Sequence, residues 1–127
     1  MEFVSTDRAP KAIGPYSQAT IADDVVYTAG QIALDPASGQ LVAGGTAVEA
    51  ERVLENLKAV LAAAGLGFEH VVKVTIYLVD LADFATVNDI YGRYVREPFP
   101  ARATVGVAAL PRGARVEIYA VAVRSKD

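Results

Sequence analysis

Short segments rich in β-branched and aromatic residues occupy the beginning of the chain, and polar positions separate them. Residues 2–5, 17–22 and 25–29 have this character, which favours β-strands. Asp23 and Asp24 stand between the second and third segments and are typical of a tight reversal. We therefore expect residues 17–22 and 25–29 to form two strands joined by a short turn.

The spacing of apolar residues changes after an irregular loop that ends in two glycines. Apolar residues then recur at three- and four-residue steps, which predicts an amphipathic helix from Thr46 to near Gly65. The positions with this spacing are Val53, Leu54, Leu57, Val60, Leu61 and Ala64. Thr46 and Glu49 fit a capping box, in which side chains satisfy free backbone amides at a helix start. We expect this helix to pack against the core and assign it no chemistry.

A fourth strand and a second helix follow. Residues 72–79 are mostly apolar and alternate only weakly, which is typical of a strand covered on both faces. Asp80 or Asp83 can cap the next helix, which is predicted to continue through Tyr94. Asn88 lies beside the apolar stripe of this helix, where a solvated or structural amide is the favoured interpretation.

The last part of the chain, residues 99–123, is predicted to form two strands and a turn. Pro100 can begin or edge a strand, and Pro111 with Gly113 supplies the backbone angles that a reversal needs. These signals together predict a hairpin.

Arg102 and Glu117 place opposite charges on the two strands of this hairpin. If Gly106 pairs with Glu117, then Arg102 and Thr104 share a face of the sheet with Glu117. The two charged residues then lie about four residues apart along the strands, roughly 13 Å between backbones, a gap that their side chains, a small acid and a water can fill. The alternative is that Arg102 is an exposed edge charge or part of an internal ion pair.

The expected order of elements is three strands, a helix, a strand, a second helix and two strands. This order predicts an α+β fold in a single domain of residues 1–127, with two helices on one face of a sheet of about six strands. Val105, Tyr119 and Val121 then need burial on the face without helices. Self-association is the economical way to bury them.

Composition argues against several classes of protein. The chain is 53% hydrophobic, yet no apolar run approaches the ~20 residues that a membrane span needs. The N-terminus lacks the layout of a secretory signal and cysteine is absent, so we expect a cytoplasmic protein. A formal net charge of −3 argues against a general attraction to nucleic acid.

Few residues are suited to metal or phosphate chemistry. His70 is the only histidine, so the sequence predicts no metal centre, and its setting indicates an ordinary surface or capping histidine. Gly44-Gly45 lacks the Lys-Ser/Thr continuation of a phosphate-binding loop.

Several separated motifs resemble, in the same order, the signature of the RidA family, also called the YjgF family of enamine and imine deaminases. The motifs are Pro100-Ala101-Arg102, Leu110-Pro111-Arg112-Gly113 and Val116-Glu117-Ile118, with further matches at 12–19, 29–32 and 53–57. The resemblance covers nearly the whole chain. It implies a chorismate-mutase-like fold and a homotrimer in which three sheets surround a central barrel, with three pockets between subunits.

The resemblance also implies roles for individual residues. Arg102 coincides with the carboxylate-binding residue, Glu117 with the water-orienting residue and Tyr16 with the tyrosine of a conserved motif. Gly30 and Thr104 coincide with positions whose backbones contact the ligand. From its place at a strand end alone, Gly30 also fits a β-bulge.

Asn88 corresponds in this family to a residue near a neighbouring subunit's pocket. Three positions depart from the common pattern. Thr104 replaces a Cys of some members, Ala29 replaces a Ser of many, and Tyr119 stands where many have a second Glu. The last two changes bear on pocket polarity and on substrate range.

These residues suit the hydrolysis of 2-enamine and 2-imino acids such as 2-aminoacrylate and 2-iminobutyrate. A guanidinium binds a carboxylate through two parallel hydrogen bonds, so we expect Arg102 to anchor the substrate. Glu117, as a base or orienting acceptor, can aim a water at the imine carbon, after which ammonia leaves and a 2-oxo acid remains. Positioning supplies most of this catalysis, so no cofactor is expected.

Three alternatives remain open from the sequence. A non-catalytic small-acid-binding or chaperone-like trimer would need Arg102 but not Glu117. RNA cleavage or translation inhibition, attached to some relatives, would need a basic groove with aromatic faces. The arginines available for such a groove are Arg93, Arg96, Arg112, Arg115 and Arg124. A chorismate-rearranging enzyme of the same general fold is disfavoured, because the motifs match the RidA family.

Overall fold

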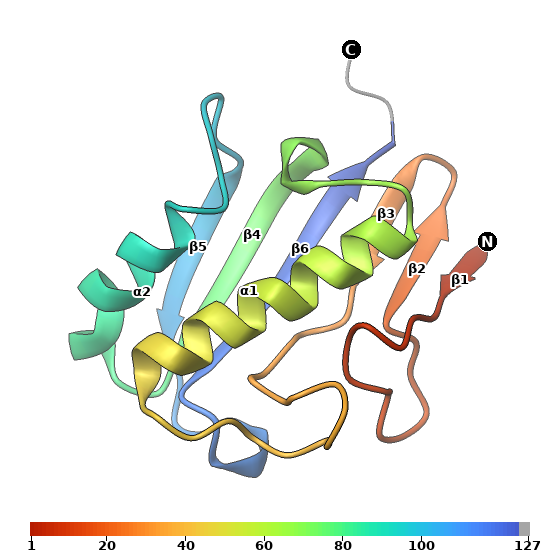
Figure 1. The fold of residues 1–127 in the computed structure, drawn as a ribbon. Helices are drawn as coiled ribbons and strands as arrows, with labels where there is room; N and C mark the ends of the chain where they lie inside the picture. The colour runs from red at the N-terminus through yellow and green to blue at the C-terminus, as the bar shows by residue number, and fades with distance from the viewer. Residues whose placement is uncertain (125–127) are drawn as a thin grey trace.

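Six short segments form one mixed β-sheet in the computed structural model, which describes residues 1–124 (Figure 1). The strands are β1 (Glu2–Val4), β2 (Ala19–Ala22), β3 (Val25–Thr28), β4 (Val71–Leu78), β5 (Ala101–Gly106) and β6 (Val116–Val123). Their order across the sheet is β1-β2-β3-β6-β4-β5, and all neighbours are antiparallel except β4 and β5. This sheet and its two helices agree with the predicted α+β class.

The reversal predicted at Asp23-Asp24 joins β2 to β3. The two strands pair antiparallel, with Ala22 opposite Val25. Asp23 has a φ of 54°, the left-handed conformation that Asp tolerates better than most residues. The prediction of two strands joined by a short turn is therefore confirmed.

The helix α1 (Thr46–Ala63) is the amphipathic helix that the apolar spacing predicted. Its inner face packs on the sheet and beside the second helix, and several of its aliphatic residues are completely buried. Each such side chain contributes roughly 1.5–3 kcal/mol, so tertiary packing rather than local propensity stabilises the helix. The chain turns away at Gly65, whose φ of 80° suits a glycine.

The capping box predicted at the start of α1 is wrong. Gly45 is the N-cap residue, and no side chain caps the helix. The Thr46 hydroxyl instead donates to the Asp83 carboxylate at 2.8 Å, and the Glu49 carboxylate accepts from the backbone N–H of Arg115 at 2.8 Å. Both side chains therefore bind partners in other elements, and these tertiary contacts replace the local cap.

The second helix, α2 (Phe84–Tyr91), ends before the predicted Tyr94. A 3₁₀ turn, Leu81–Asp83, precedes it, and the Asp80 side chain caps this turn by accepting from the backbone N–H of Ala82 at 2.9 Å. Of the two predicted caps, Asp80 is therefore the one that forms. Neither helix of the described chain is long and apolar enough to cross a membrane.

The hairpin predicted for residues 99–123 is wrong, because β4 lies between β5 and β6. Arg102 is opposite Val74 of β4, whereas Glu117 is opposite Tyr77. Val74 and Tyr77 are three residues apart in one strand, so their side chains point to opposite faces of the sheet. Arg102 therefore lies on the face that carries the helices, and Glu117 lies on the other face.

The connection between β5 and β6 explains this arrangement. Residues 107–115 are long enough to pass across the end of β4, and they include a 3₁₀ turn at Pro111–Gly113. The backbone of Val79, next to β4, bonds to Arg115 on the far side of this connection. The apolar strand β4 thereby gains a hydrogen-bonded neighbour at both edges. The cover on both faces that its weak alternation predicted is not present in the single chain: Val74, Ile76 and Leu78 are buried on one face, whereas Tyr77 on the other face is only partly buried.

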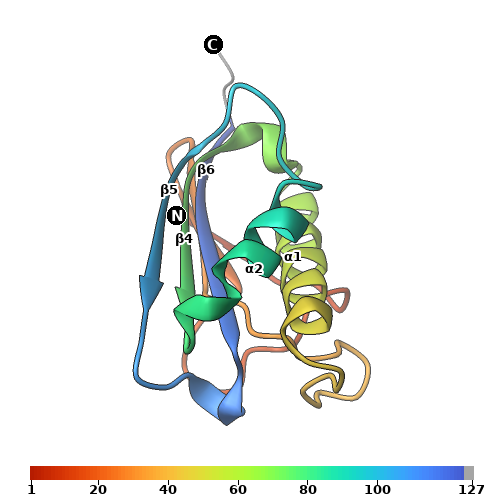
Figure 2. The ribbon, with the colours of Figure 1, turned by 90° about the vertical axis from the view of Figure 1, so that its left-hand side faces the viewer.

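Both helices cover one face of the sheet and leave the opposite face open (Figure 2). Along β6, the even-numbered residues are buried beneath the helices and the odd-numbered residues are only partly covered. On the open face, Tyr27 is 49% exposed and Val105 is 42% exposed. The apolar face that the sequence predicted without a helical cover is therefore present.

Candidate functional site

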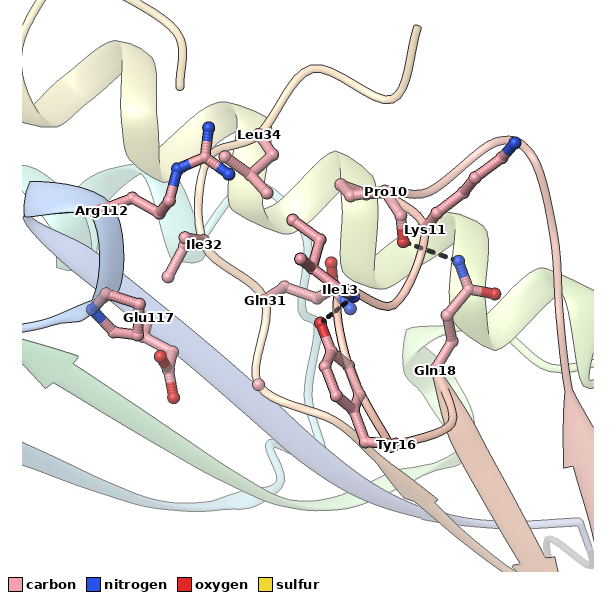
Figure 3. Close-up of a pocket in the computed structure, with 12 residues that line it drawn as sticks. Pro10, Lys11, Ile13, Tyr16, Gln18, Gln31, Ile32, Leu34, Arg112 and Glu117 are labelled. Carbon is pink, nitrogen blue, oxygen red and sulfur yellow. Dashed lines mark hydrogen bonds between the residues drawn. The ribbon is translucent and has the colours of Figure 1, made fainter. Parts of the chain in front are cut away.

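Tyr16, Gly30 and Glu117 line one pocket, although they come from three separate parts of the chain. Figure 3 shows Tyr16 and Glu117 in this pocket. Tyr16 belongs to the loop before β2, Gly30 follows β3, and Glu117 is near the start of β6. The pocket has a volume of about 320 Å³, and its apolar lining includes Ile13 and Ile32. We call it the main pocket.

Gly30 lies directly against the Glu117 side chain. The next residue, Gln31, pairs with Ile118: the Gln31 N–H donates to the Ile118 carbonyl at 2.9 Å, and the Ile118 N–H donates back at 3.1 Å. A Cβ atom on Gly30 would lie only 2.9 Å from the carboxyl carbon of Glu117. The group that approaches Gly30 within one chain is therefore the Glu117 side chain, and contact between the Gly30 backbone and a ligand stays a prediction.

The Glu117 carboxyl is half-buried and electrostatically isolated. Burial raises its pKa above the ordinary value, because desolvation disfavours the charged form. Within residues 1–124, no basic side chain forms an ion pair with it. A carboxylate with a raised pKa is a stronger base than an exposed one, which suits it to accept a proton from water.

The loop that carries Tyr16 is fixed by hydrogen bonds. The Tyr16 hydroxyl oxygen accepts from the backbone N–H of Ile13 at 3.2 Å, as drawn in Figure 3. Gly14, with a φ of 137°, accepts from the Tyr16 N–H at 2.9 Å and so closes a tight turn. The buried Gln18 amide donates to the Pro10 carbonyl at 2.8 Å. The Tyr16 hydroxyl hydrogen is left free to donate to a ligand.

Arg102 and Asn88 form a second cluster, between α2 and the edge strand β5. The guanidinium donates to the Asn88 side-chain oxygen at 2.7 Å. It also lies 5.6 Å from the ring centre of Phe84 and 5.1 Å from that of Tyr91, as cation–π contacts require. No carboxylate in residues 1–124 pairs with Arg102, so the internal ion pair considered from the sequence is wrong.

Thr104 lies on the same face of β5 as Arg102. Its hydroxyl is buried and has no hydrogen-bond partner among residues 1–124. The structure thus brings Arg102, Asn88 and Thr104 together but does not bring them into the main pocket. The single constellation predicted on one face of a hairpin is wrong within one chain, because the intervening β4 fixes the register of both strands.

Ala29 and Tyr119, two of the three departures from the family pattern, lie outside the lining of the main pocket. The backbone N–H of Ala29 donates to the Gln18 carbonyl at 2.8 Å. Tyr119 lies on the open face, where its ring centre is 6.1 Å from that of Tyr77. A hydrogen bond from Thr75 lowers the pKa of the Tyr119 hydroxyl. Neither position changes the polarity of the main pocket in one chain.

Sequence reasoning missed two cations that line the main pocket, Lys11 and Arg112. Arg112 has a φ of 62°, and its guanidinium donates to the Gly39 carbonyl at 3.2 Å. The sequence indicated Arg112 as part of a turn, of a family motif and of a possible nucleic-acid groove, but not as a residue of this pocket. Lys11 lies in an irregular stretch where no periodicity indicates which way a side chain points.

The arginines considered for a nucleic-acid groove are not gathered in one place. Arg93 and Arg96 line one cleft, and Arg112 lines the main pocket. Arg115 and Arg124 form ion pairs elsewhere. The fold therefore does not build the groove that the RNA alternative requires of these five residues.

His70 has a structural role, as its setting indicated. Its Nδ1 accepts a hydrogen bond from the backbone N–H of Gly67 at 3.1 Å, at the start of a 3₁₀ turn. In the described part of the chain, no group of three or more His, Cys, Asp or Glu residues is arranged to hold a metal ion.

The chain is similar to a known protein family, to named proteins and to solved structures. Residues 6–124 match the profile of the family described as Endoribonuclease L-PSP. Protein DfrA of Myxococcus xanthus is 60% identical over 122 residues, which are 94% of this chain and 93% of that protein. The 2-iminobutanoate/2-iminopropanoate deaminase of Bos taurus is 55% identical over 123 residues, which are 97% and 90% of the two chains. Among solved structures, E. coli TdcF with bound serine matches with a TM-score of 0.93 and 41% identity, over 98% of this chain and 100% of that one.

Proposed function

Since the chain belongs to the Endoribonuclease L-PSP family, the RidA/YjgF family whose motifs it carries, we propose that it is an enzyme that hydrolyses 2-imino acids to 2-oxo acids and ammonia. The bovine relative is named for 2-iminobutanoate and 2-iminopropanoate deamination. The structural observation that carries the proposal is the isolated Glu117 carboxyl, which has a raised pKa and lies against Gly30 in the main pocket.

The proposed site combines groups from two subunits. In a 2-imino acid the carboxylate is bonded directly to the imine carbon, so the carboxylate anchor and the base must stand within a few ångströms of each other. In one chain, Arg102 and Glu117 are on opposite faces of the sheet. We therefore propose that the Arg102, Asn88 and Thr104 cluster of one subunit faces the main pocket of the next. The Arg102 guanidinium, which is exposed and has no carboxylate partner among residues 1–124, supports this arrangement.

The proposed assembly is a homotrimer in which the three open sheet faces line a central barrel. The exposed apolar side chains of Tyr27 and Val105 support self-association, since burial of apolar surface contributes about 25 cal/mol per Å². In a ring, one edge of each subunit meets a different edge of the next subunit. Such contacts join two unlike clusters and generate three identical sites.

Substrate binding in this site follows from the chemistry of its donors. Arg102 binds the carboxylate through two parallel hydrogen bonds, and Asn88 holds the guanidinium ready for it. The Tyr16 hydroxyl hydrogen is free to donate to the substrate, since its oxygen already accepts from the chain. Gly30 and Thr104 contact the substrate through their backbones.

The chemical step adds one water and removes one ammonia. Glu117 accepts a proton from water as the water oxygen bonds to the imine carbon, and it delivers that proton to the imine nitrogen. The carbinolamine then loses ammonia: Glu117 takes the hydroxyl proton and returns it to the leaving nitrogen as the carbonyl forms. An enamine such as 2-aminoacrylate enters this sequence after tautomerising to the imine. No electron carrier takes part.

A coupled assay tests the proposal. Threonine dehydratase generates 2-iminobutyrate, and the release of 2-oxobutyrate is followed in buffer alone and with the protein. We expect the native protein to accelerate release, Arg102→Ala to remove the acceleration, and Glu117→Ala to lower it about 10²-fold. Arg93→Ala is the matched control, since Arg93 is an exposed arginine paired with Asp89 at 3.3 Å.

The same experiment separates the enzyme from a small-acid-binding protein. A folded, assembled protein that binds serine through Arg102 without accelerating release would replace the deaminase proposal by the binding role. Equal loss of activity in Arg93→Ala and Arg102→Ala would contradict the role assigned to Arg102.

A further inference from the structure

The inner face of α1 carries two strongly polar side chains among its aliphatic residues. Glu49 is 4% exposed and Asn56 is completely buried. The two residues are two helical turns apart and so project toward the same side of the helix. Burial of a carboxylate or an amide costs free energy unless hydrogen bonds compensate for it, so the partners of these side chains explain their presence.

Asn56 binds the backbone of segment 30–34. Its side-chain nitrogen donates to the carbonyls of Ile32, at 3.2 Å, and Leu34, at 2.9 Å. Its side-chain oxygen accepts from the Arg52 guanidinium at 3.0 Å, which orients the amide with its nitrogen toward the segment. Both Ile32 and Leu34 line the main pocket.

Glu49 binds the backbone at the start of β6. Its carboxylate accepts from the backbone N–H of Arg115 at 2.8 Å, and it lies 4.0 Å from the Arg115 guanidinium. Arg115 precedes Glu117 by two residues, so Glu49 fixes the point from which the strand carrying Glu117 begins.

The two contacts hold two neighbouring walls of the main pocket, segment 30–34 and the start of β6. On its other side, segment 30–34 pairs with β6 through Gln31 and Ile118. We propose that Asn56 and Glu49 are positioning residues that set the approach of Gly30 to the Glu117 carboxylate. This role rests on the function proposed for Glu117. A displacement of either wall would move the carboxylate away from the place where it meets water and substrate.

Substitution at each position tests the proposal. Asn56→Leu and Glu49→Leu remove the hydrogen bonds and keep the side chains of similar size. We expect kcat to fall about tenfold, with KM changed less than roughly threefold, because the carboxylate anchor Arg102 belongs to the other cluster. Glu49→Gln keeps an acceptor oxygen for the Arg115 N–H and is expected to retain most of the native kcat.

Tyr94→Phe is the matched control. The Tyr94 hydroxyl donates to Glu55 of α1 at 2.7 Å, so this variant also removes a tertiary hydrogen bond of the same helix. Neither Tyr94 nor Glu55 lines the main pocket. We expect Tyr94→Phe to lower the temperature of unfolding without a change in kcat.

A second readout is independent of turnover. The pKa of the Glu117 carboxyl, followed by NMR titration, is expected to fall toward the ordinary value in Asn56→Leu and Glu49→Leu, because loosened walls admit water. It is expected to stay raised in Tyr94→Phe. If a leucine variant does not fold, Asn56→Asp removes the same donated bonds with less change of shape.

The outcomes distinguish this inference from the proposed function. A native protein without deaminase activity would refute the function, while the titration would still decide whether Asn56 and Glu49 hold the carboxyl. An unchanged kcat and Glu117 pKa in the leucine variants, or an equal loss of kcat in Tyr94→Phe, would overturn the positioning role.

Discussion

At the scale of single residues, the pair formed by Gly30 and Glu117 determines the chemistry proposed for the main pocket. The absent side chain of Gly30 makes room for the carboxyl group, and the surrounding chain removes part of its water. Desolvation raises the pKa of Glu117, which makes its carboxylate a better proton acceptor. One glycine therefore affects both the place and the basicity of the proposed base.

Gly30→Ala is expected to lower kcat/KM about 10- to 100-fold, because the new methyl group would displace the Glu117 carboxylate. Steady-state deamination of 2-iminobutyrate measures the effect. Gly92→Ala is the control: it has a helical φ of −60°, and its Cβ would meet only ordinary contacts at 3.5 Å. Native activity in Gly30→Ala would show that catalysis does not depend on the position of the Glu117 carboxylate next to Gly30.

The raised pKa of Glu117 predicts the pH dependence of both activity and stability. The ionised form is the base, so kcat/KM should fall as pH drops through a pKa above that of an ordinary glutamate. The folded state binds the proton more tightly than the unfolded state, so this group's contribution to stability decreases as pH rises through the same window. Glu117→Gln should lose the acidic limb of the remaining activity and gain stability relative to the native protein at pH above the window. An acidic limb unchanged in Glu117→Gln, after subtraction of the buffer reaction, would assign it to another group.

At the scale of elements, α1 connects parts of the chain that are distant in sequence. Its apolar face packs on the sheet, and its polar residues bind the loop after β3, the start of β6 and the turn before α2. Segment 30–34 and the start of β6, which form two walls of the main pocket, are therefore both hydrogen-bonded to the same helix. The N-terminus of α1 has no side-chain cap as a result, because Thr46 and Glu49 bind other elements instead.

A double-mutant cycle tests whether Thr46 stabilises the protein through its hydrogen bond to Asp83. Thr46→Val and Asp83→Ala should each lower the free energy of unfolding by about 1 kcal/mol, because each removes the same hydrogen bond. The double variant should lose little more than either single variant. Urea unfolding provides the measurement. Fully additive losses would mean that Thr46 stabilises the helix through the cap and not through Asp83.

The sequence predicts the local elements of this fold better than their pairing. Apolar spacing indicates α1, and Asp23-Asp24 indicates the turn between β2 and β3, since both signals act over a few residues. The motifs around Tyr16, Gly30 and Glu117 also predict residues that meet in one pocket. The position of Arg102 could not be predicted in this way, because its face depends on β4, which is remote in sequence and inserts between β5 and β6.

At the scale of the whole molecule, one face of the sheet and two incomplete clusters remain available to a partner. The open face carries exposed apolar residues, and Arg102 stands on the opposite side of the sheet from Glu117. A second copy of the chain can supply what each cluster lacks. The proposed site is then a property of the assembly and not of the single chain.

Mixing two inactive variants tests this arrangement. Arg102→Ala and Glu117→Ala subunits, unfolded together and refolded in equal amounts, should regain about a quarter of the native activity, because a random trimer pairs intact halves at that frequency. Each variant refolded alone should stay inactive. If the site lay within one chain, no mixture could contain an intact site, and the activity would not return.

The central place of β6 has a consequence for the synthesis of the protein. This last strand joins β3 to β4, so it closes the sheet between the N-terminal strands and the β4–β5 pair. Until it leaves the ribosome, β3 and β4 each present an unpaired edge, of the kind that recruits strands from other chains. The nascent protein therefore passes through an aggregation-prone interval, and a ribosome that stalls shortly before Val116 would release the hazardous fragment.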